Sequence, residues 1–67
     1  MESIGTLEFV DLDSNDKAFA SVRASAGAVA LTLSLEKNGD IDVFLPLESC
    51  RSLIHLLNLA LQTASTS

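Results

Sequence analysis

The segment from Leu47 to Ala64, LESCRSLIHLLNLALQTA, carries more apolar surface than a helix packed on a single neighbour needs. At about 100° per residue, most of its apolar side chains fill one broad side of a helix, named here the apolar arc. Leu56 and Leu59 lie outside the arc, on a helix flank that a monomer would normally fill with polar residues. This helix flank therefore predicts a second partner. The apolar arc comprises Leu47, Cys50, Leu53, Ile54, Leu57, Ala60, Leu61 and Ala64.

The chain has few other means of stabilising a small fold. Its 67 residues form a single domain, and a chain of this size buries only about 60% of its unfolded surface. The single cysteine, Cys50, cannot form an internal disulfide, and together with the single histidine, His55, it cannot complete a zinc site. No metal or cofactor is expected. We expect instead a homodimer with Leu56 and Leu59 in its interface, beside Ser52 and His55.

Turn-forming residues divide the chain into four strands and one helix. The expected strands cover residues 4–12, 17–25, 28–36 and 41–45, and the helix covers residues 47–64, with residues 64–67 frayed. Pro46 ends the last strand and opens the helix, because it lacks an N–H group and has a fixed φ. The short turns predict an α+β fold, a four-stranded antiparallel meander (ββββα) with the C-terminal helix packed on one sheet face.

The alternation of apolar and polar residues also predicts the strand register, because directly opposed residues share a face of the sheet. A three-residue loop at residues 37–39 keeps the apolar residues of its two strands on one face, whereas a two-residue loop mixes the faces. Gly39 should then have a positive φ, opposite a one-residue bulge. The expected pairs are Leu35 with Ile41, Leu33 with Val43, Leu31 with Leu45, Val22 with Leu31, Leu7 with Val22, Phe9 with Ala20 and Val10 with Phe19.

These pairings give the sheet two unlike faces. The inner face is apolar and is expected to form the core beneath the helix. The outer face mixes polar residues with apolar ones, and Val10, Phe19 and Phe44 make it a second candidate interface. The inner face comprises Leu7, Phe9, Ala20, Val22, Ala24, Val29, Leu31, Leu33, Leu35, Ile41, Val43 and Leu45.

The sequence contains no recognisable catalytic or metal-binding motif. Cys50 and His55 are separated by about 140° on a helix, so they do not share a face. Cys50 is interpreted as a core thiol, and His55 as a surface residue of the polar stripe or a partner contact. Residues 11–16 are rich in aspartate but lack the glycine and glutamate of an EF-hand loop, which indicates a polar hairpin turn.

Charge excludes one class of partner. The nine acids and four bases give a net charge of −5, and the bases Lys17, Arg23, Lys37 and Arg51 are scattered. Direct binding to nucleic acid is therefore not expected, since it depends on several basic contacts with phosphates. The chain shows neither a signal peptide nor an apolar run long enough to span a membrane, and its lone cysteine suits a cytoplasmic location.

These observations favour a small acidic, non-enzymatic protein-interaction module, a homodimer acting as a regulator, inhibitor or accessory subunit. An antagonist of a host protein, from a phage or mobile element, is one version suggested by size and charge alone. The alternative is an oligomer that holds an anionic small molecule at its subunit interface through Arg23 or Arg51. An enzyme would need a site shared between subunits, with His55 as its general base.

Overall fold

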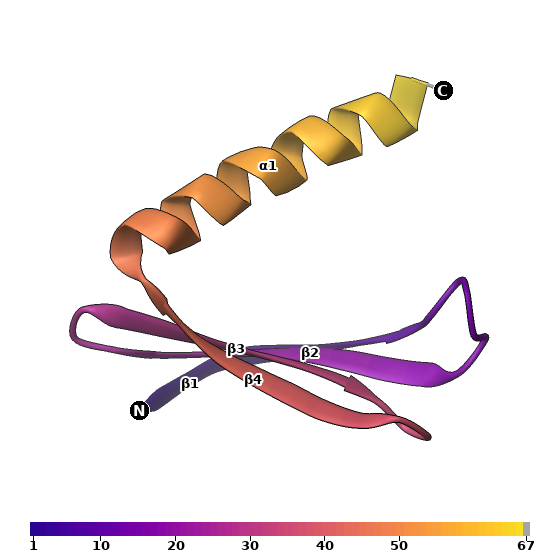
Figure 1. Cartoon of the computed structure of the whole chain (residues 1–67), viewed down its shortest axis with the longest axis horizontal. Coiled ribbons are helices and arrows are strands. Elements are labelled where there is room, and N and C mark those ends of the chain that lie inside the picture. Colours follow the sequence, from indigo (N-terminus) through magenta and orange to yellow (C-terminus); the bar gives the residue numbers. More distant parts are fainter. Residues whose placement is uncertain (67) are drawn as a thin grey trace.

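The computed structural model describes residues 1–66 and shows one antiparallel sheet followed by one helix (Figure 1). The strands are β1 (Glu2–Val10), β2 (Lys17–Ser25), β3 (Ala28–Leu35) and β4 (Gly39–Pro46), and the helix is α1 (Leu47–Thr66). The strand order is β1-β2-β3-β4, so the predicted ββββα meander is confirmed. The helix continues to Thr66 rather than ending at Ala64. Ser67, which was predicted to fray, lies outside the described residues.

The central hairpin has the predicted register, and the following hairpin is displaced. Val22 lies opposite Leu31, as predicted. In the β3–β4 hairpin, Leu31 pairs with Val43, because the three-residue loop falls at residues 36–38 rather than at 37–39. Gly39 has the predicted positive φ, 81°, but it pairs within an uninterrupted ladder, without the predicted bulge. A displacement of two residues leaves every side chain on its predicted face.

Strand β1 begins and ends two residues earlier than predicted, at Glu2 and Val10. Phe19 therefore lies opposite Glu8, whereas Val10 pairs with Lys17. The predicted pairing of Val10 with Phe19 is wrong, as are the other β1–β2 pairs. The displacement again amounts to two residues over most of the ladder, so both faces keep their composition.

Hydrogen bonds hold the loop at residues 11–16 against the turn at residues 36–38, and the two together are named here the turn cluster. Asp11 Oδ2 accepts hydrogen bonds from the hydroxyl and the N–H of Ser14, at 2.7 and 2.9 Å. These bonds lower the pKa of Asp11, the hydroxyl more than the N–H. The buried carboxylate of Asp16 accepts the N–H groups of Lys17 and Lys37, at 3.0 and 2.9 Å. The aspartates therefore form a hairpin turn, as predicted, and Asp11 starts that turn directly after Val10.

The helix packs on the sheet through its first turns. It contacts β3 and β4, and Cys50 and Leu53 are its partly covered residues, both in the apolar arc. Leu45 of the inner face shares a hollow of about 430 Å³ with Leu53 and neighbouring residues of α1. The helix therefore lies on the inner side of the sheet, and its C-terminal end rises away from the strands (Figure 1).

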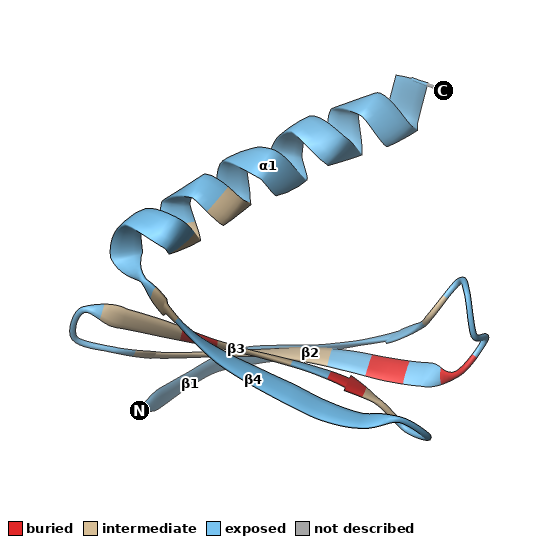
Figure 2. Cartoon of the chain, viewed as in Figure 1, coloured by how far each residue is buried: buried red, intermediate tan, exposed pale blue. Residues whose placement is uncertain are grey.

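The inner face is not buried within one chain, contrary to the prediction of a core beneath the helix. Among residues 1–66, the buried apolar side chains are those of Ala18 and Ala30, and no residue of α1 is buried (Figure 2). The reason is geometric: α1 is joined directly to Pro46 and covers only the adjoining end of the inner face. The uncovered half of the inner face comprises Leu7 (64% exposed), Phe9 (44%), Leu33 (46%), Ile41 (60%) and Val43 (40%).

Candidate interaction surfaces

Two exposed apolar surfaces lie on the inner side of the sheet, one on the sheet itself and one on the helix. One is the uncovered half of the inner face, where a hollow of about 390 Å³ is lined by Phe9, Leu33, Ile41 and other residues. The other is the part of the apolar arc beyond the first turns of α1, which includes Leu57 and Leu61, 60% and 66% exposed. Exposed apolar surface of this extent marks an interaction site in a folded protein.

The helix flank is a third exposed surface. Leu56 and Leu59 are exposed, as are the neighbouring Ser52 and His55. Leu56 and Ser52 line the same hollow as Leu45 at the base of the helix. The structure therefore places the Ser52 and Leu56 part of the flank beside the attachment of α1 to the sheet, next to Leu53 of the apolar arc.

The accessible surface of the chain is too large for a compact monomer. A monomer of 7.1 kDa exposes about 4,100 Å², whereas this chain exposes 5296 Å². Its radius of gyration is 13.3 Å, compared with about 11 Å for a compact domain of this length. The excess surface, about 1,200 Å² per chain, is larger than the roughly 800 Å² that each partner buries in a standard interface.

The outer face does not bring its three candidate residues into one cluster. Phe44 lies opposite Ala30, whereas Phe19 lies opposite Ser34, four residues further along β3. A polar row separates the two aromatic rings. In that row Ser21 and Thr6 share a hydrogen bond of 2.9 Å between their hydroxyl groups, and Thr32 donates to Asp42.

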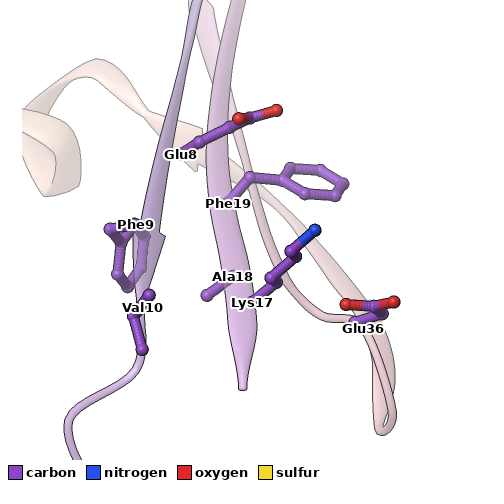
Figure 3. Close-up of a pocket in the computed structure, with 7 residues that line it drawn as sticks. All are labelled: Glu8, Phe9, Val10, Lys17, Ala18, Phe19 and Glu36. Carbon is purple, nitrogen blue, oxygen red and sulfur yellow. The ribbon is translucent and has the colours of Figure 1, made fainter. Parts of the chain in front are cut away.

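Phe19 and Val10 lie near a hollow of about 450 Å³ at the end of the β1–β2 ladder (Figure 3). Phe19, Glu8 and Lys17 extend from one side of the ladder in this view, and Glu36 lies beyond Lys17. The basic group of Lys17 therefore lies in the same region as the carboxylates of Glu8 and Glu36, and the ring of Phe19 lies between Lys17 and Glu8. Nearby carboxylates disfavour the capture of an anion here.

The two arginines proposed as anion ligands have acidic neighbours in the same chain. The guanidinium of Arg23 lies 3.8 Å from the carboxylate of Asp42, and that of Arg51 lies 2.5 Å from Glu48. Each carboxylate offsets the positive charge that an anionic ligand would meet. No observation therefore favours the small-molecule alternative.

Sequence reasoning missed the uncovered half of the inner face and the role of Asp16. The uncovered half could have been predicted from the number of apolar residues. The inner face and the apolar arc together carry more apolar side chains than a short chain can bury. Asp16 gave no signal, because its second partner, the N–H of Lys37, is distant in sequence. Within residues 1–66, no group of three or more histidine, cysteine or acidic residues could hold a metal ion.

No family model matches the chain, and neither a curated protein nor a solved structure matches it significantly. No helix within residues 1–66 is long and apolar enough to cross a membrane.

Proposed function

We propose that this protein is a non-enzymatic protein-interaction module that acts as a homodimer. The observation that carries the proposal is the excess accessible surface of the chain, about 1,200 Å², together with the exposed apolar residues of the inner face and α1. Two-fold dimers with self-complementary surfaces are the commonest soluble oligomers. In this proposal the helix flank, with Leu56 and Leu59, lies within the dimer interface.

The outer face is the surface that remains for a different protein. It presents the exposed rings of Phe19 and Phe44 among acidic residues that include Asp40 and Asp42. Aromatic rings supply contact area, and carboxylates favour a basic partner surface. A module with one face for itself and one for a basic protein suits a regulator, an inhibitor or an accessory subunit in the cytoplasm.

Sedimentation and native mass spectrometry test the two parts of this proposal. Over a concentration series, the wild-type chain of 7.1 kDa should sediment as a dimer. Purified gently from its source, it should carry a second protein in fixed stoichiometry. Phe44→Glu should release that protein, whereas Leu12→Glu should retain it, because Leu12 is fully exposed in the 11–16 loop rather than on the outer face.

Three outcomes would contradict the proposal. A wild-type monomer at high concentration would remove the homodimer. A small-molecule adduct in place of a second protein would favour the ligand-binding alternative. A second protein that Phe44→Glu retains would remove the outer face as its docking surface.

A further inference from the structure

The uncovered half of the inner face lacks a partner in its own chain. Its five side chains are all more than a third exposed, and the hollow among Phe9, Leu33 and Ile41 has room for an apolar side chain. The helix of the same chain contacts only β3 and β4, and its partly covered residues, Cys50 and Leu53, lie in its first two turns. The rest of the helix leaves this half of the sheet open.

The chain itself carries a surface that matches this one. The apolar arc beyond Leu53 is exposed, and its 20-residue helix is about 30 Å long. The strands, of eight or nine residues, span about 26–30 Å. The helix is therefore long enough to run the full length of the strands, although it covers only one end of its own sheet.

Charge also favours a second copy as the occupant. Each chain carries a net charge of −5, so most ways of bringing two copies together place carboxylates near one another. The side chains of the uncovered half and of the apolar arc are uncharged, and the two aspartates that also line the hollow, Asp11 and Asp40, accept hydrogen bonds from Ser14 and Ser34. Two acidic chains can therefore meet through these surfaces with both of these carboxylates hydrogen-bonded.

We propose that the α1 helix of a second copy lies along the uncovered half of the inner face, and that the exchange is reciprocal. The inference rests on the homodimer of the proposed function and specifies how that dimer forms. Leu57 and Leu61 of each chain contact Phe9, Leu33 and Ile41 of the other. The excess surface of about 1,200 Å² per chain is sufficient for this interface.

A matched pair of variants tests the surface. Ile41 and Phe44 lie on opposite faces of β4 and are 60% and 62% exposed. Ile41→Glu should raise the dimer dissociation constant by about 10- to 100-fold, because it removes a buried side chain and introduces a charge. Phe44→Glu should leave it unchanged. Sedimentation measures both, and circular dichroism checks that each variant keeps its sheet and helix.

Isotope-filtered NMR of the wild-type protein tests the occupant without mutation. In a mixture of labelled and unlabelled chains, intermolecular NOEs should join the methyl groups of Leu57 and Leu61 to the ring of Phe9. Intermolecular NOEs that join only sheet to sheet, or only the Leu56 and Leu59 methyl groups of two helices, would overturn the inference.

The outcomes separate this inference from the function on which it rests. A dimer that survives Ile41→Glu and lacks the helix-to-sheet NOEs leaves the homodimer in place but overturns helix exchange. A dimer broken by Phe44→Glu and not by Ile41→Glu places the interface on the outer face and also overturns the exchange. A monomeric wild-type protein overturns both.

Discussion

The turn cluster and the uncovered half of the inner face are neighbours, since Asp11 and Asn38 line the same hollow as Ile41, yet they are completed to different degrees. In the turn cluster, the Asp16 carboxylate is buried and accepts hydrogen bonds from Lys17 and Lys37. Between helix and sheet, Ile41 and Leu57 are both 60% exposed. The chain satisfies the buried carboxylate of Asp16 from its own backbone and leaves its largest apolar surfaces uncovered.

This difference follows from what each kind of interaction requires. A buried carboxylate needs a few donors in fixed positions, and two neighbouring turns of one chain can supply them. A hydrophobic core needs area on two facing layers, and a single helix joined at one end covers too little of it. The turn cluster should therefore be stable within a single chain, whereas the packing of the helix on the sheet should depend on association of two chains.

The largest expected effect, on the oligomeric state, comes from substitutions on the helix flank. Leu56→Glu with Leu59→Glu should convert the dimer to a monomer or unfold it, because each leucine contributes roughly 1.5–3 kcal/mol when buried. Sedimentation over a concentration series measures the change. Asn58→Glu with Gln62→Glu adds the same charge to the polar stripe and should stay dimeric. A dimer that survives the leucine substitutions would show that the helix flank lies outside the interface.

The next effect comes from breaking the turn cluster. Asp16→Ala removes the acceptor for the N–H groups of Lys17 and Lys37 and should cost about 2–3 kcal/mol of unfolding free energy. Urea denaturation at one protein concentration measures this loss. The matched control, Asp13→Ala, changes an exposed aspartate of the same loop. Equal stability of the two variants would show that the buried carboxylate contributes nothing.

A smaller effect is expected at the turn between β3 and β4. Gly39 has a φ of 81°, with open space around the position of a Cβ atom. Gly39→Ala should therefore cost about 1 kcal/mol through backbone strain alone. Gly5→Ala is the control, because Gly5 also has open space but no positive φ. A Gly39→Ala protein as stable as the wild type would contradict the left-handed turn.

The smallest effect concerns pH. The hydroxyl and the N–H of Ser14 lower the pKa of Asp11 below its ordinary value of 3.8. The stability that Asp11 contributes is therefore fully present above about pH 4 and is lost as the pH falls through the lowered pKa. NMR titration should show the Asp11 midpoint rising in Ser14→Ala. An unchanged midpoint would show that the Ser14 hydroxyl does not affect the titration.

The sequence predicted the face that the strand residues occupy, but it predicted the correct partner only in the β2–β3 hairpin, where Val22 lies opposite Leu31. A hairpin displaced by two residues keeps the same alternation, so the apolar pattern cannot distinguish the pair Leu31–Val43 from Leu31–Leu45. Strand β1 ends at Val10, and the turn that follows contains the hydrogen bonds from Ser14 to the carboxylate of Asp11. Side-chain geometry of this kind is not visible in a pattern of apolar residues.

The candidate interfaces could also be predicted only in part from the sequence. The excess apolar surface of the helix was evident from Leu56 and Leu59. The exposure of Ile41 was not evident, because the same apolar side chains can cover the sheet of their own chain or that of another. The pattern therefore predicts that these surfaces are covered, but not by which molecule.

The helix α1 follows β4 directly, with Leu47 joined to Pro46 and no loop between them. Because the helix is held to the sheet at one end only, a rotation of about 10° at this junction moves the far end, some 30 Å away, by about 5 Å. Such a rotation widens or narrows the space above the inner face without breaking a hydrogen bond of the sheet. A small change in the backbone dihedral angles at this junction therefore becomes a large displacement at the C-terminal end of the helix.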